Sequence, residues 1–288
     1  MISERNLEMN ATIDKFSKSK EFLVCVDSDG CAMDTMEVKH RKCFGPKIVE
    51  IWHLQDIEEE FLETWNKINL YSKTRGINRF KGLVRVFEVF KEQGVDIIPD
   101  FSSIKKWTET TPELSNPALM KAIEKTKDEQ LMKALEWSNA VNESIAKLEG
   151  QDNPFKGVKE GLEIISKYAN IAIVSSANTG AVVSEWTRHN LMPSVSVICG
   201  QEDGTKATCI AKLKQKDFSK YNVLMVGDAP GDLDAALKNE VSYYPILVGK
   251  EEFSWKRLAS EALPKLLDGS YNGEYQDKLI EEFNLSLE

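Results

Sequence analysis

The chain has 288 residues, of which 42% are hydrophobic and 29% charged, values that are ordinary for a globular protein. Its formal net charge of −9 argues against broad electrostatic binding to nucleic acid, and no apolar stretch approaches the roughly 18 residues of a membrane span. The five cysteines include no CxxC pair, and residues 1–21 lack the apolar segment of a signal peptide. We therefore expect a cytoplasmic protein without nucleic-acid or membrane partners, and the oligomeric state stays open.

The first predicted strand, residues 22–26, runs directly into an acidic segment. Asp27 closes the aliphatic run, and Asp29 and Gly30 follow within the next turn. Two neighbouring carboxylates can divide the work of a reaction, because one attacks an electrophile while the other moves a proton. Gly30 lets the backbone bend closely around a bound oxyanion. This segment is thus a candidate catalytic loop.

Two other interpretations of the same segment explain less. A calcium-binding EF-hand loop would need Gly and Glu where Ala32 and Val38 stand. A helix cap formed by Asp34 or Thr35 would open the next helix. Capping accounts for those two residues and leaves the pair at 27 and 29 unexplained.

Residues 36–152 predict a mainly helical insertion. Helical spacing of apolar residues predicts helices over 58–70, 80–90 and 131–148, and no convincing strand occurs. Because the insertion follows the first strand at its carboxyl end, we expect a cap domain that acts as a lid over the site. A helical domain that merely packs alongside is the alternative.

From residue 153 onward strands and helices alternate, which predicts an α/β fold with a Rossmann-like parallel sheet core. That core is discontinuous, comprising residues 1–35 and 153–288, and a polar helical tail begins at Glu251, with Trp255, Leu258 and Leu266 available to dock. The expected strands are 171–174, 195–198, 223–226 and 246–248, and the expected helices are 158–168, 180–189, 205–215 and 233–237.

A second acidic segment follows the predicted strand 223–226, with Asp228 and Asp232 in it. Ligands of open α/β sheets bind beyond the carboxyl ends of the strands. If the two acidic strands are neighbours, Asp27, Asp29 and Asp228 converge and repel one another unless a cation lies among them. Oxygen ligands favour a hard ion, and Mg²⁺ is the expected cofactor.

Other candidates for binding an anionic substrate lie between and beside these segments. Ser175 and Ser176 follow one predicted strand, and Lys206 opens a helix, where each can contact phosphate oxygens. Arg75 and Arg79 belong to a stretch, residues 73–81, that holds four cations in nine residues of an acidic chain. That stretch either binds a second anionic group of the substrate or is a solvated loop.

The order of these features resembles the four sequence motifs of the haloacid dehalogenase-like hydrolase superfamily. The resemblance covers residues 20–40 and 154–248 and implies a phosphatase-type enzyme with a helical cap. It implies that Asp27 is the nucleophile and forms an aspartyl-phosphate, and that Asp29 is the acid and base. The other implied roles are phosphate binding by Ser175, charge balance by Lys206, and Mg²⁺ binding by Asp27, the Asp29 carbonyl and Asp228 with support from Asp232.

The expected function is therefore Mg²⁺-dependent hydrolysis of a small phosphorylated metabolite. Asp29 favours phosphoryl transfer, since relatives that cleave carbon–halogen bonds need no acid there. A phosphomutase or a phosphonatase on the same core is the alternative, and a non-catalytic binding module is a third.

Overall fold

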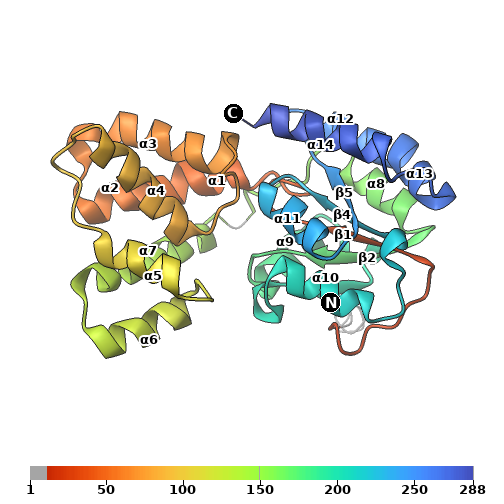
Figure 1. Ribbon diagram of the computed structural model, residues 1–288, viewed down its shortest axis with the longest axis horizontal. Coiled ribbons are helices and arrows are strands. Elements are labelled where there is room, and N and C mark those ends of the chain that lie inside the picture. The colour runs from red at the N-terminus through yellow and green to blue at the C-terminus, as the bar shows by residue number, and fades with distance from the viewer. Residues whose placement is uncertain (1–11, 149, 288) are drawn as a thin grey trace. The chain divides into compact units, whose positions relative to one another are not determined.

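The computed structural model describes residues 12–148 and 150–287 and consists of two compact units (Figure 1). The core unit combines the chain up to Thr35 with the chain from Asp152 onward, and the insertion comprises residues 36–151. The prediction that residues 1–21 lack a signal peptide falls partly on residues 1–11, which lie outside the described residues. Within the described chain, no helix combines the length and apolar character needed to cross a membrane.

The core unit is built on a five-stranded sheet in which every strand pair is parallel. The strand order is β3-β2-β1-β4-β5, so that β1 occupies the centre, between β2 and β4. Most of these strands are short aliphatic runs, because both faces of a parallel sheet are covered by helices. The strands are β1 (Phe22–Val26), β2 (Ala169–Val174), β3 (Val197–Cys199), β4 (Val223–Gly227) and β5 (Ser242–Pro245).

Alternate residues of each strand enter different hydrophobic layers. Val24 and Val26 of β1 face one layer, and Leu23 and Cys25 face the other. This two-residue period is the geometry of a pleated strand, and it makes the core a three-layer α/β fold of the expected class. Its helices are α8 (Val158–Ile165), α9 (Thr179–Arg188), α10 (Lys206–Lys214), α11 (Pro230–Lys238), α12 (Glu251–Arg257), α13 (Leu263–Asp268) and α14 (Glu274–Ser286).

The prediction of a last strand at residues 246–248 is wrong, because the strand is β5, just before it. Tyr244 of β5 pairs with Val226 of β4, whereas the Leu247 N–H turns away from the sheet and donates to Ser254 Oγ at 3.1 Å. Ile246 and Leu247 are buried, and of these two residues only Ile246 still bonds to β4 through its N–H, at the Gly227 carbonyl. Aromatic side chains rather than aliphatic ones fill β5.

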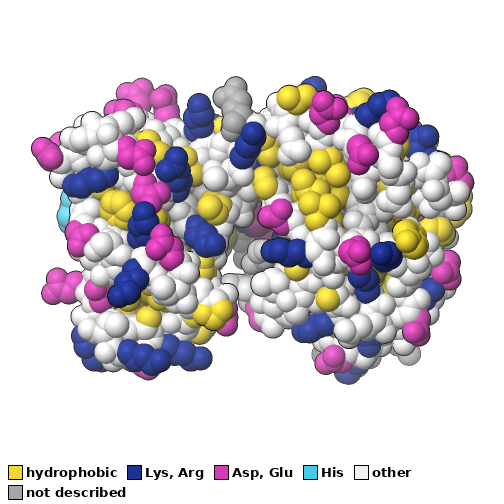
Figure 2. All heavy atoms as spheres, viewed as in Figure 1, with side chains coloured by type: hydrophobic (Ala, Val, Ile, Leu, Met, Phe, Trp, Pro, Cys, Tyr) yellow, Lys and Arg dark blue, Asp and Glu magenta, His cyan; other side chains and the backbone are white. Residues whose placement is uncertain are grey.

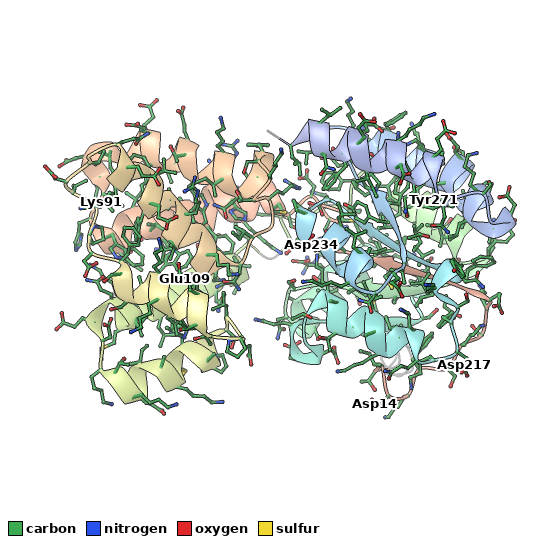
Figure 3. All side chains as sticks on the ribbon, viewed as in Figure 1. Asp14, Lys91, Glu109, Asp217, Asp234 and Tyr271 are labelled. Atoms are coloured by element: carbon green, nitrogen blue, oxygen red, sulfur yellow. The ribbon has the colours of Figure 1, made fainter. Side chains whose placement is uncertain are left out.

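The chain ends of the core unit pack onto it. Trp255, Leu258 and Leu266 of the C-terminal tail are buried, as the sequence predicts. At the other end, Lys216 donates to the Asp14 carbonyl and Lys18 to the Asp217 carbonyl, and Figure 3 shows Asp14 and Asp217 close together. Figure 2 shows cationic and anionic side chains interspersed over the face in view of each unit.

The insertion is helical throughout its described elements, as its periodicity predicts. Its core is rich in aromatic side chains, and Trp137 contacts the rings of Trp52, Trp65 and Phe80 in edge-on geometry. Two π-helical turns, His40–Phe44 and Lys67–Tyr71, extend its α-helices. These are α1 (Met36–Lys39), α2 (Gly45–Trp52), α3 (Glu58–Asn66), α4 (Arg79–Glu92), α5 (Ser102–Thr110), α6 (Asn116–Thr126) and α7 (Glu129–Ala146).

Candidate active site

Three carboxylates meet at the carboxyl ends of the central strands β1 and β4. Asp27 follows β1, Asp228 follows β4, and Asp232 lies in the first turn of α11. One oxygen of each lies within 4.8 Å of the others, and the three residues are 5%, 0% and 0% exposed. The pairing of β1 with β4 creates this convergence, because it sets two strand ends side by side at one edge of the sheet.

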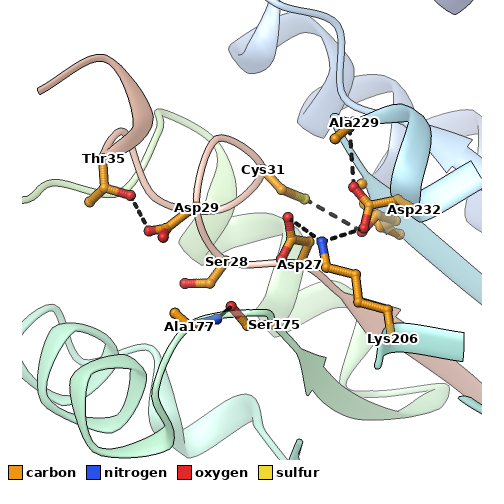
Figure 4. Close-up of polar contacts among 12 residues, drawn as sticks. Asp27, Ser28, Asp29, Cys31, Thr35, Ser175, Ala177, Lys206, Ala229 and Asp232 are labelled. Carbon is orange, nitrogen blue, oxygen red and sulfur yellow. Dashed lines mark hydrogen bonds and ion pairs between the residues drawn. The ribbon is translucent and has the colours of Figure 1, made fainter. Parts of the chain in front are cut away.

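Lys206, at the start of α10, joins two of these carboxylates (Figure 4). Its Nζ lies 2.9 Å from Asp27 Oδ2 and 2.5 Å from Asp232 Oδ1. Burial alone would lower the pKa of Lys206, but the attraction of Asp232 and Asp27 outweighs burial and raises it. The ammonium is therefore a permanent positive charge of the site.

Burial raises the pKa of Asp27 well above its usual range. Lys206 opposes that rise, and the neighbouring Asp232 and Asp228 add to it. With all groups ionised, three carboxylates and one ammonium leave a charge of −2 in a buried space. Oxygen donors with excess negative charge are the donor set that Mg²⁺ prefers, so these residues fit that ion.

Asp232 is held by its own helix as well as by Lys206. Its Oδ2 accepts the Ala229 N–H at 3.1 Å, and the Ala229 carbonyl accepts the Asp232 N–H at 2.9 Å. A Cβ on Gly227 would stand 2.3 Å from the Asp232 carboxyl carbon, so the close approach requires glycine at the end of β4. Asp232 thus orients Lys206 and stabilises the first turn of α11.

The catalytic loop, residues 27–35, folds back on the Ser28 carbonyl. That oxygen accepts the N–H groups of Ala32 at 3.0 Å and Met33 at 2.8 Å. Gly30 takes a φ of 82°, which favours glycine, and its N–H donates to the Met33 carbonyl. The chain reverses within a few residues and brings Thr35 to the Asp29 side chain.

Asp29 lies in this loop, half-buried and outside the trio of carboxylates. The Thr35 hydroxyl donates to its Oδ1, as Figure 4 shows. Thr35 therefore orients the Asp29 side chain, in addition to preceding α1. The separation of Asp29 from the trio suits a carboxylate that exchanges protons rather than one that shares a cation.

Ser175 and Ser176, which follow β2, differ in their surroundings. Ser175 is buried, its N–H donates to the Cys199 carbonyl of β3, and its Oγ accepts the Ala177 N–H at 3.1 Å. Ser176 is exposed. In Figure 4 Ser175 lies on the strand end beside the catalytic loop, so its hydroxyl hydrogen can point toward a bound anion.

The two candidate arginines of the insertion have partners within that unit. Arg75 is buried and donates to the Leu70 carbonyl at 2.6 Å. Arg79 donates to Ser138 Oγ at 3.0 Å and to Asn142 Oδ1 at 2.7 Å, and burial lowers its pKa to about 10. Lys73 and Lys81, the first and last residues of the same cationic stretch, are exposed.

Two residues that contact the catalytic loop escape sequence reasoning. The indole N–H of Trp186 donates to Ser28 Oγ at 2.9 Å, and that of Trp255 donates to the Cys31 carbonyl at 2.9 Å. These contacts span 158 and 224 residues, and no local spacing signals them. Ser28 consequently points to α9, away from the carboxylates.

Comparison with known protein families identifies the class of the chain. Residues 99–245 match the model described as haloacid dehalogenase-like hydrolase. That match exceeds half of the chain, and the protein belongs to this family of hydrolytic enzymes. The matched stretch includes Ser175, Lys206, Asp228 and Asp232, whereas the catalytic loop lies before it.

Solved structures are similar to the chain at low sequence identity, and the one with a TM-score above 0.5 shows the same fold. A protein from Lactobacillus delbrueckii subsp. bulgaricus, assigned as a phosphoglycolate phosphatase, is 14% identical with a TM-score of 0.51, over 92% of this chain and 98% of that one. A haloacid dehalogenase-like family hydrolase from Streptococcus pneumoniae is 15% identical with a TM-score of 0.45, over 91% and 98%. No curated protein matches the chain.

Proposed function

We propose that this hydrolase is a Mg²⁺-dependent phosphatase that acts on a small phosphorylated metabolite through an aspartyl-phosphate at Asp27. The observation that carries the proposal is the buried trio of Asp27, Asp228 and Asp232 with Lys206 between two of its members. Phosphoryl transfer depends on positioning and charge neutralisation more than on elaborate covalent chemistry. A fixed carboxylate beside a permanent ammonium supplies both.

In the first proposed step, a carboxylate oxygen of Asp27 forms a bond to phosphorus while the bond from phosphorus to the leaving oxygen breaks. Asp29 gives its proton to that leaving oxygen. In the second step a water oxygen attacks phosphorus, Asp29 takes the water proton, and the bond to Asp27 breaks. Inorganic phosphate leaves, and both carboxylates return to their starting states.

Three residues support these steps without exchanging atoms with the substrate. Lys206 keeps Asp27 oriented and offsets the negative charge of the phosphoryl group. Ser175 offers its hydroxyl to a phosphoryl oxygen. Asp232 holds Lys206 in place.

Mg²⁺ would be held by the Asp27 and Asp228 carboxylates and by the backbone carbonyl of Asp29. Asp232 would contribute from beside the ion, because its oxygens already contact Lys206 and the Ala229 N–H. When bound, the ion would neutralise the cluster and let an anionic phosphoryl group approach.

We propose that the insertion is a cap that selects the substrate. Support comes from chain order, because the catalytic loop ends at Thr35 and the insertion begins at the next residue. The cationic stretch at residues 73–81 is the candidate for a second anionic group. Lys73 and Lys81 are its exposed cations, whereas Arg75 and Arg79 contact residues of the insertion itself. A cytoplasmic location suits the five cysteines, which are all free.

Phosphate release from a panel of phosphorylated metabolites and an aryl phosphate, with and without Mg²⁺, tests this function. We expect Mg²⁺-dependent release from at least one compound. Isomerised sugar phosphate without free phosphate would indicate a phosphomutase. A lysine trapped by borohydride during phosphonate cleavage would indicate a phosphonatase. If the folded protein releases no phosphate from any compound of the panel, a binding module would be favoured.

A further inference from the structure

Two tryptophans on different helices hold the catalytic loop by their indole N–H groups. Trp186 of α9 donates to the Ser28 hydroxyl, and Trp255 of α12 donates to the Cys31 carbonyl, each at 2.9 Å. Both indoles and both acceptor residues are fully buried. Water cannot replace a lost partner at such a depth, so each bond constrains the loop strongly.

The two indole hydrogen bonds hold the catalytic loop at Ser28 and Cys31, where the chain reverses. Ser28 lies between the proposed nucleophile Asp27 and the proposed acid Asp29, and its carbonyl gathers the backbone N–H groups of the turn. Its side chain is fixed by Trp186, whereas the far side of the turn is fixed at Cys31 by Trp255. A rotation of the turn that displaced Ser28 or Cys31 would disturb these indole bonds.

The Trp255 ring packs closely against α8. A Cβ on Gly161 of α8 would stand 2.7 Å from the ring, so only glycine leaves room there. The helix that carries Trp255 is tied to the sheet, because the Tyr244 hydroxyl of β5 donates to the Ser254 carbonyl at 2.7 Å. The Trp255 indole therefore connects the catalytic loop to a helix that is itself fixed to the sheet.

The helix that carries Trp186 is anchored at both ends. Asn178 caps its first turn by accepting the N–H groups of Gly180 and Ala181. Near its last turn, Arg188 pairs with Asp152, and the next residue along also contacts that carboxylate. Trp186 thus projects from a fixed helix into the centre of the catalytic loop.

We propose that Trp186 and Trp255 are positioning residues that hold Asp27 and Asp29 in their reactive arrangement. The inference rests on the proposed function insofar as it takes these aspartates to be the reacting groups. Displacement of a reacting group by about 1 Å can cost roughly 100-fold in rate. Neither indole contacts the substrate in this account, and each acts through the loop.

The test replaces each indole by phenyl, a smaller aromatic ring without the N–H, so a control must account for the lost volume. Trp186→Phe and Trp255→Phe should lower kcat for an aryl phosphate by roughly 10-fold or more, with KM changed less than about two-fold. The matched control is Trp65→Phe in the insertion, since Trp65 is equally buried and its Nε1 has no hydrogen-bond partner among the described residues. The control should keep kcat within about two-fold.

A double variant checks that Ser28 and Trp186 act as one unit. Ser28→Ala and Trp186→Phe remove the same bond, so the combined variant should be no slower than the slower single variant. Multiplied losses would mean that the two residues act separately, and would contradict the positioning role of their bond.

Amide hydrogen exchange of the loop peptide measures the constraint without turnover. Each phenylalanine variant should speed exchange at Cys31, Ala32 and Met33, and the Trp65 control should not. Unchanged exchange and unchanged kcat would overturn the proposal, as would faster exchange with unchanged kcat in an active enzyme. If the wild type releases no phosphate from any compound, the proposed function fails, and exchange alone then decides whether the indoles constrain the loop.

Discussion

The core unit and the insertion use aspartate in opposite ways. In the core unit Asp27 is buried beside two other carboxylates, and burial raises its pKa. In the insertion Asp128 opens α7, where the Ser103 hydroxyl and the N–H groups of Gln130 and Leu131 lower its pKa. A carboxylate that caps a helix is satisfied by its surroundings. The buried trio is strained by its own charge, and that marks it as a site for a ligand.

The same contrast separates the partly or fully buried cations of the two units. Lys206 of the core unit faces carboxylates that belong to the proposed chemistry. Arg75 and Arg79 of the insertion face carbonyl, hydroxyl and amide oxygens of their own unit. Burial of a charge therefore does not identify a functional residue by itself. The group that faces the charge identifies a functional residue better than burial does. The predictions below test this difference between the two units.

The largest expected effect follows from Asp27→Asn. Loss of the proposed nucleophile should lower kcat by about 10³-fold or more. Because an amide removes one of three mutually repelling charges, the metal-free protein should unfold at the same temperature or higher. Thermal unfolding and phosphate release measure the two results. Asp234→Asn is the matched control, since Asp234 is exposed on α11 (Figure 3) and should retain activity.

Mg²⁺ should act on stability as well as on turnover. An ion that binds only the folded chain adds about 2.7 kcal/mol when its concentration is 100 times its Kd. Unfolding with and without Mg²⁺ should show this rise in the wild type and in Asp234→Asn, and Asp228→Asn should lose most of it. A full Mg²⁺ response in the Asp228 variant would place the ion elsewhere.

A smaller effect is expected at the cationic stretch of the insertion. Lys73→Ala should raise KM roughly five-fold for substrates with a second anionic group, which corresponds to about 1 kcal/mol for an exposed ion pair. Turnover of a simple aryl phosphate should stay unchanged. Lys121→Ala, at an exposed lysine of α6, is the control. Equal KM values for both variants would remove the stretch from substrate selection.

The smallest predicted effect is structural. Asp128→Ala should lower the free energy of unfolding by about 1 kcal/mol at neutral pH, because α7 loses its cap. The folded chain holds the pKa of Asp128 below its usual 3.8, so the unfolded chain binds more protons in acid. The difference between variant and wild type should therefore shrink as the pH falls below that value. A constant difference would show that the charge of Asp128 contributes nothing.

Sequence patterns are sufficient where one element carries its own signal. The aliphatic runs of β1, β2 and β4 predict a parallel sheet. The segments after β1 and β4 predict that Asp27 and Asp228 gather, whereas Asp29, expected beside them, lies outside the trio. Helical periodicity finds Phe80, Leu83 and Phe87 on the buried face of α4. Such signals work because buried strands and amphipathic helices leave a local period in the sequence.

Other features depend on contacts between distant segments. The sequence pattern does not predict the edge strand β5, because its buried residues are tyrosines rather than aliphatic residues. Their hydroxyls form hydrogen bonds within the core, and Tyr243 donates to the Gly227 carbonyl at 3.1 Å. The indole bonds to the catalytic loop come from α9 and α12, and no spacing near Ser28 or Cys31 announces them. Arg79 is a further example, since its contacts with Ser138 and Asn142 of α7 join residues 59 and 63 positions apart.

Chemical trapping at Asp27 tests the central claim most directly. The enzyme is denatured rapidly during turnover with Mg²⁺ and a good substrate, and borohydride then reduces any acyl phosphate to an alcohol that a peptide mass spectrum locates. The account predicts a reduced side chain at position 27, present only with substrate. Continuing phosphate release with no reduced residue there, or with reduction at Asp29 instead, would contradict it.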